Sequence, residues 1–148
     1  MHHNLLDLYK RDLLAVKAEV ASFSNEDDLW KTVGTINNSA GNLALHISGN
    51  LLHFFGAILL KNGYIREREK EFNDKNIPKT EIVSRLEQTI DVVTKVLENF
   101  DETTWESYYP IPIKNENVTH FYFFIHLYGH LNLHLGQINY IRRGFFDK

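Results

Sequence analysis

Residues 118–143 read VTHFYFFIHLYGHLNLHLGQINYIRR, a segment in which four histidines and no carboxylate stand among mostly apolar side chains. Residues 39–61 read SAGNLALHISGNLLHFFGAILLK and add two histidines, again without a carboxylate. The two segments hold six of the eight histidines in the 148-residue chain. In a buried helix the backbone cannot supply partners for both ring nitrogens of every imidazole, whereas neutral imidazole is the commonest side-chain metal ligand. The pattern therefore predicts a divalent metal ion between two helices.

The spacing of the histidines limits which of them can share one ion. Residues four apart on a helix lie on one face, about 6 Å apart along the axis. One ion can thus take His126 with His130, or His130 with His134, but His126 and His134 are about 12 Å apart. His46 and His53 are separated by about 10 Å, so we expect only one of them at a given ion. Antiparallel helices would bring His46 level with His134 and His53 with His130, while parallel helices would bring His46 nearer His126, and spacing alone leaves both sets open.

Two more segments show apolar residues at helical spacing, about residues 4–22 and residues 80–99. Ser39 is a suitable N-cap for the helix at 39–61, which we expect to end near Lys61-Asn62-Gly63. Four amphipathic helices in a chain of this length predict one all-α domain, a four-helix bundle spanning residues 1–148.

The two long connections differ in character. Tyr64–Lys79 is rich in charge, which is typical of a solvated segment. It is also longer than an antiparallel hairpin requires, so it can act as a crossover that makes the helices it joins parallel. Residues 100–116 contain Trp105, Tyr108 and Tyr109 and predict a loop or a short strand pair, which either lines the mouth of a pocket or plugs the end of the bundle.

Composition excludes several classes of function. The chain has no cysteine, so it has no disulfide, thiolate metal site or cysteine nucleophile of its own. A net charge of −3 without a basic patch gives no reason to expect nucleic acid. Charged residues interrupt the apolar N-terminal residues, so we find no signal peptide, and histidines, asparagines and glycines break both apolar segments, which predicts buried rather than membrane-spanning helices. We expect a cytoplasmic protein.

The motifs narrow the chemistry further. The histidine-bearing segments lack the Glu-x-x-His pairs of di-iron bundles and the His-Glu-x-x-His of zincins, and the chain has neither a glycine-rich phosphate loop nor a G-x-S-x-G elbow. Asn50, one turn after His46, and Gln137, close to one turn after His134, are candidates for holding a bound water or substrate, or for satisfying buried backbone. No catalytic residue is assigned. We interpret the remaining histidines of the two segments as structural or supporting residues: His53, His120 and His126.

The sequences NLALHISGNL at 42–51 and GHLNLHLGQINYIRR at 129–143 resemble the DinB-like superfamily, in particular one of its uncharacterised branches. The resemblance spans most of the chain, and its specific part is the single histidine in the first segment with H-x-x-x-H-x-G-Q in the second. It implies a four-helix bundle in up-down-down-up order with a long crossover between the second and third helices. It also implies that the two histidine helices run antiparallel and that His46, His130 and His134 bind the metal. The chain departs from the commonest family form, H-x-x-H-H-R-G-Q, at Leu133 and Leu135.

The resemblance also suggests an activity. It implies zinc or nickel as the metal, with iron or manganese as alternatives, and a homodimer. It implies a metal-dependent transferase or isomerase that acts on a small molecule with a low-molecular-weight thiol. A hydrolase that uses metal-bound hydroxide is a further possibility. The alternative is a non-catalytic, metal-binding, dimeric stress-response module.

Overall fold

The computed structural model describes residues 2–147, which are helical with irregular connections and contain no β-strand. The all-α class predicted from the sequence is therefore confirmed. The helices are α1 (His2–Ala21), α2 (Ala40–Leu51), α3 (Arg68–Asn73), α4 (Lys79–Glu98) and α5 (His120–Ile141), with π-helical continuations of α2 over Leu52–Leu60 and of α5 over Arg142–Phe146, and 3-10 turns at Glu26–Trp30 and Glu102–Thr104.

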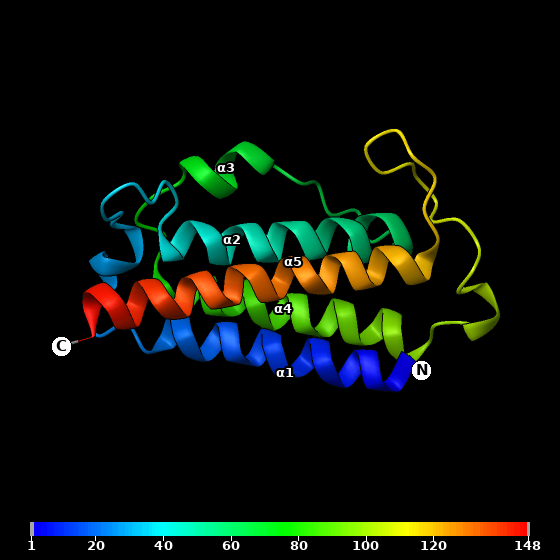
Figure 1. Cartoon of the computed structure of the whole chain (residues 1–148), viewed down its shortest axis with the longest axis horizontal. Helices are drawn as coiled ribbons and strands as arrows, with labels where there is room; N and C mark the ends of the chain where they lie inside the picture. The colour runs from blue at the N-terminus through cyan, green and yellow to red at the C-terminus, as the bar shows by residue number, and fades with distance from the viewer. Residues whose placement is uncertain (1, 148) are drawn as a thin grey trace.

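The four long helices pack side by side along the length of the molecule (Figure 1). α1 and α5 run in one direction, and α2 and α4 run in the other. α1 and α2 each contact both α4 and α5. The connection after α2 returns along the outside of α2, includes α3, and brings the chain back to the start of α4 (Figure 1). The two histidine-bearing helices, α2 and α5, are thus antiparallel neighbours.

Side-chain caps explain where the two histidine helices begin. The Ser39 hydroxyl accepts a hydrogen bond of 3.2 Å from the backbone N–H of Asn42, and the Thr119 hydroxyl accepts one of 3.2 Å from Tyr122. Such caps satisfy N–H groups that have no partner within the helix. At the other end of the α2 segment, Lys61 adopts a left-handed conformation, with φ of 51°. The N-cap and the end expected from the sequence are both confirmed.

All twelve residues of α2 are buried. α3 packs on the side of α2 that the other long helices leave open (Figure 1). The combined segment Ala40–Leu60 is long and apolar enough to cross a membrane by length and composition, and 67% of its most apolar window is buried inside the protein. That is the burial of a core helix, and it places the polar side chains of α2 in the interior.

The loop before α5 closes one end of the molecule. Trp105 and Tyr109 are buried, and the Tyr109 hydroxyl donates a hydrogen bond of 2.6 Å to the backbone oxygen of Phe54. Tyr108 is exposed. His120 is buried, and its Nδ1 lies 3.0 Å from the carbonyl oxygen of Ser107. These buried rings plug the end of the helices, and the short strand pair considered above is reduced to two isolated β-bridges, Tyr108 with Thr119 and Ile113 with Glu116.

Candidate metal centre

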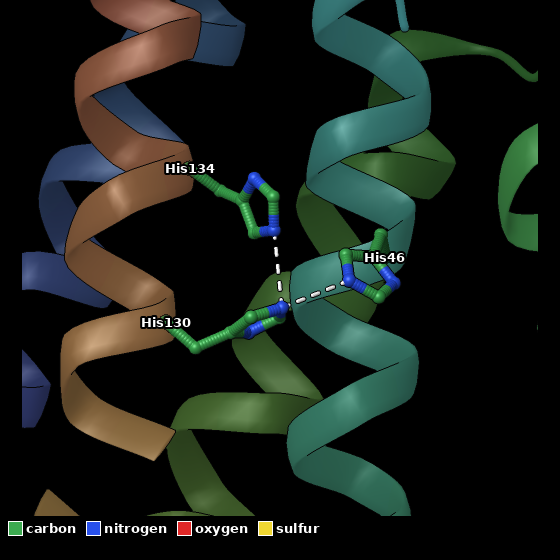
Figure 2. A group of neighbouring side chains, drawn as sticks. All are labelled: His46, His130 and His134. Atoms are coloured by element: carbon green, nitrogen blue, oxygen red, sulfur yellow. Dashed lines mark hydrogen bonds between the residues drawn. The ribbon is translucent and has the colours of Figure 1, made fainter. Parts of the chain in front are cut away.

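Three histidines meet between α2 and α5. His46 comes from the middle of α2, and His130 and His134 lie one turn apart on α5 (Figure 2). The Nε2 atom of His130 is 3.0 Å from Nε2 of His46 and 3.0 Å from Nε2 of His134. The three side chains offer ligand atoms that all lie within 4.8 Å of one another. This is the set that an antiparallel arrangement of the two helices allows.

The two contacts of His130 have the separations of nitrogens bound to a single ion. With metal–nitrogen bonds of about 2.0–2.1 Å, ligands at angles between octahedral and tetrahedral stand about 2.9–3.4 Å apart. Both contacts of His130 fall in that range. Within residues 2–147 the group contains three histidines and no fourth protein ligand. Such a set leaves a coordination position for water or substrate, which is characteristic of catalytic rather than structural metal sites.

The outer nitrogens of two of these rings have acceptors. His46 Nδ1 lies 2.9 Å from Oε1 of Glu71, and His134 Nδ1 lies 2.7 Å from Oε1 of Gln137. When Nδ1 of His46 and of His134 carries the proton, each N–H donates a hydrogen bond to its oxygen. The Nε2 atom of each ring then presents a lone pair toward His130. Hydrogen bonds of this kind set the tautomer and orientation of metal-binding histidines. The Nε2 atoms of His46 and His134 are acceptors, so the three inner nitrogens cannot all pair by hydrogen bonds among themselves. A cation between them would bind all three lone pairs.

Glu71 is itself held firmly. Arg66 donates two hydrogen bonds of 2.8 Å to it, from Nε to Oε2 and from Nη2 to Oε1. Burial opposes ionisation of Glu71, but the hydrogen bonds from Arg66 and His46 outweigh it and keep the pKa of the carboxyl below its usual value. Glu71 is therefore a carboxylate, which accepts a hydrogen bond from Nδ1 of His46 and raises the basicity of Nε2.

Gly49 makes room for this carboxylate on α2. A Cβ atom at Gly49 would lie 2.1 Å from Oε2 and 2.5 Å from Cδ of Glu71, closer than atoms can approach. α3 is also tied to the start of α2, because the Asn42 side chain donates to the backbone oxygens of Glu71 (3.0 Å) and Asp74 (2.9 Å). The Phe72 ring lies 4.7 Å from the ring of His46. α3 thus carries one supporting residue onto a surface shaped to accept it.

The surroundings of His130 and His134 keep the inner nitrogens of these two rings unprotonated. Burial, together with the neighbouring His134 and His46, lowers the pKa of His130 to about 3. Burial also lowers the pKa of His134, partly offset by its hydrogen bond to Gln137. Metal binding requires neutral imidazole, so His130 and His134 can bind a metal at neutral pH without first losing a proton.

The same shifts predict how the metal-free protein responds to acid. The pKa of His130 is lower in the folded chain than in the unfolded chain, so the unfolded chain binds more protons below about pH 6.5. The free energy of unfolding therefore decreases as the pH is lowered. We expect urea unfolding of the metal-free protein to give a lower free energy at pH 5 than at pH 7. The effect is less than about 1.4 kcal/mol per pH unit for one group, because His130 is half-buried and solvent screens it. His130→Gln should reduce the difference, and an equal difference in that variant would contradict the assignment.

A cleft of about 590 Å³ opens beside the histidines, within the range of small-molecule sites. His46 and His130 line it together with residues from the end of α2 and its continuation, the returning connection, the loop before α5 and the first half of α5: Asn50, His53, Phe54, Arg66, Arg68, Ile111, Pro112, Ile113, Lys114, Phe123, His126 and Leu127. The loop before α5 therefore does reach the cleft, through residues 111–114 rather than through its tryptophan and tyrosines.

Comparison with protein families shows which family the chain belongs to. Residues 6–148 match the family described as a protein of unknown function, DUF1572. The chain belongs to the DUF1572 family. The comparisons with curated proteins and with solved structures return no match. The family description assigns no activity, so function rests on the site itself.

The other candidate residues of this DUF1572 protein differ in how they relate to the triad of His46, His130 and His134. Gln137 contacts His134 directly. Asn50 is buried and lines the cleft, and its Oδ1 has no hydrogen-bond partner. His53 and His126 line the cleft but are not part of the three-histidine group.

Sequence reasoning missed the contribution of α3 to this DUF1572 site. The charged stretch was expected to be solvated, yet its Glu71 is buried against His46. The available signal was Phe72, an aromatic residue within the charged run, which a solvated segment would not need. The two histidine helices carry no carboxylate, and α3 supplies one. It contacts Nδ1 of His46, on the side of the ring that faces away from the other two histidines.

Proposed function

We propose that the chain is a metal-dependent enzyme of the DinB-like superfamily, with a four-helix bundle in up-down-down-up order and an open divalent-metal site at His46, His130 and His134. The directions of the four long helices and the returning connection after α2 support the bundle assignment. The observation that carries the metal assignment is the meeting of three Nε2 atoms, two of which are oriented by Glu71 and Gln137.

An all-nitrogen set of ligands favours zinc or nickel over iron and manganese, which more often take carboxylates. A bound ion of this kind would lower the pKa of a water or thiol in its open position and so supply a nucleophile near neutral pH. The chain has no cysteine, so any thiol must come from a small molecule. We therefore propose a transferase that uses a low-molecular-weight thiol, with metal-dependent hydrolysis as the second activity to test.

The chain's own residues have distinct tasks in this proposal. Glu71 and Gln137 hold two of the rings with Nε2 inward. Asn50 offers a buried acceptor to a donor on the substrate. The apolar side chains of Phe54 and Phe123 form part of the cleft wall, where they exclude water from a bound substrate.

We also propose that the protein is a cytoplasmic homodimer that binds neither nucleic acid nor membrane. A net charge of −3 and the burial of the apolar α2 segment support the last two points. α5 carries exposed apolar side chains that support self-association, among them Tyr122, Ile125, Leu133 and Tyr140. A dimer of the same kind would also suit the non-catalytic alternative, so turnover has to be tested directly.

The test is metal content by mass spectrometry of protein purified without a nickel column, followed by an activity screen. We expect about one zinc or nickel per chain. With that metal bound, we expect conjugation of a small thiol to electrophiles, or hydrolysis, that a chelator abolishes and added metal restores. Absence of metal even after reconstitution would contradict the metal site. A loaded protein inactive across the panel would favour the non-catalytic module.

A further inference from the structure

The cleft beside the triad has a one-sided charge. Three cations line it, Arg66, Arg68 and Lys114, and none of its lining residues is an aspartate or a glutamate. Arg66 is neutralised by its two hydrogen bonds to Glu71, which lies behind it. Two positive charges therefore remain for whatever occupies the cleft.

These two cations come from different parts of the chain. Arg68 begins α3 and stands over the Phe72 ring, with its guanidinium carbon 5.2 Å from the ring centre. Lys114 sits at the tip of a tight turn closed by paired hydrogen bonds between Ile113 and Glu116, of 2.8 and 2.9 Å. Among residues 2–147 neither cation forms an ion pair in the structure. Both are exposed, so an incoming anion can reach them without displacing a protein carboxylate.

The turn holds Lys114 in an unfavourable conformation. Its φ is 50° and that of the next residue, Asn115, is 67°. The left-handed region is unfavourable for a residue such as lysine, whereas asparagine tolerates it. Strain of this kind is concentrated at functional sites. Here it holds a lysine at the edge of the cleft.

The inner part of the cleft is mostly apolar and suits a different part of a ligand. The apolar side chains on its wall, including Phe54, Ile111 and Phe123, suit a hydrocarbon or aromatic body. Asn50 Oδ1, buried and without a partner, suits an N–H or O–H donor. A buried acceptor left without a hydrogen bond is destabilising, and a donor on the ligand would supply the missing hydrogen bond.

We propose that this cleft binds an amphipathic organic anion, whose carboxylate or phosphate lies against Arg68 and Lys114 while its apolar body lies against the inner wall. The inference rests on the proposed function in one respect: it takes the bound anion to be the substrate of the proposed enzyme. Binding of the anion itself depends on the cations and the apolar wall, which do not require the metal. It makes Arg68 and Lys114 specificity residues for a substrate delivered to the triad.

The test compares 4-phenylbutyrate with its primary amide, which has the same shape but no charge. Affinities for the zinc-loaded full chain are measured by chemical shift titration, and repeated on zinc-free protein. We expect the acid to bind about five- to tenfold more tightly than the amide, with a preference that shrinks in high salt. Phenylpropyl phosphate tests the second anion, and the tighter of the two acids identifies the preferred charged group.

The variants decide whether the cleft is responsible. Arg68→Gln combined with Lys114→Gln should reduce the acid-to-amide ratio to below about two. Lys70→Gln is the matched control, because Lys70 is an exposed cation of α3 that pairs with Glu67 and does not line this cleft. An equal affinity of wild type for acid and amide, or a ratio that survives in the double variant, would overturn the proposal. A preference retained in zinc-free protein that cannot be reloaded would support it while contradicting the metal site.

Discussion

Replacing His130 by alanine is expected to lower the affinity for Zn²⁺ or Ni²⁺ by about a hundred- to a thousandfold. His130 is the central member of the triad, and its Nε2 is 3.0 Å from that of each of the other two histidines. Structural zinc sites bind with about 10–16 kcal/mol in total, so one ligand of four is worth about 2.5–4 kcal/mol. Competition against a chromophoric chelator measures the affinity, and mass spectrometry should show the metal lost from the purified variant.

His126→Ala is the matched control for this experiment. His126 lies one turn before His130 on α5 and lines the cleft, but it is exposed and outside the three-histidine group. We expect it to change the affinity less than threefold. Thermal unfolding of both metal-free variants checks that each is folded. If the two variants lost metal equally, the assignment of His130 rather than His126 would be wrong.

The sequence predicted the part of the site that helical periodicity controls. The four-residue spacing places His126 with His130, and His130 with His134, on one face of α5, and the Ser39 cap sets where α2 begins, so the candidate pairs of α5 and the position of His46 follow from local rules. The choice of His46 over His53, and of His134 over His126, did not follow, because both depend on helix direction. Direction is a property of the connections between helices, and only the resemblance supplied it in advance.

The supporting residues could not be predicted, because they depend on tertiary packing. Arg66 and Glu71 lie in a segment whose composition is typical of solvated loops, and the pair is buried only because α3 packs on α2. Gly49 has no local signature either. It lies in a helix interior, where glycine normally destabilises by about 0.5–1 kcal/mol, and its reason becomes visible only when the carboxylate beside it is located.

Gly49→Ala is expected to disturb both the stability and the metal affinity of the protein. The added methyl group would overlap Oε2 of Glu71 at 2.1 Å, and Arg66 holds the carboxylate from the other side. Either Glu71 leaves His46, or α3 lifts from α2. We expect the free energy of unfolding of the metal-free protein to fall by about 2–3 kcal/mol, as for overpacked cores, and the metal affinity to fall about 10- to 100-fold, as when the partner of a metal-binding histidine is lost.

A double-mutant cycle with Glu71→Ala isolates the contact between the two residues. Glu71→Ala alone should weaken metal binding by a similar factor, because His46 loses the acceptor on Nδ1. In that background the methyl group at position 49 meets no carboxylate, so Gly49→Ala should cost little more, and we expect a coupling energy of about 1–3 kcal/mol. Gly129→Ala is the control, since a Cβ there meets nothing within 4 Å and alanine favours the helix. Additive effects of the two substitutions would mean that Glu71 does not occupy the space that Gly49 leaves, and that the orientation of His46 has another source.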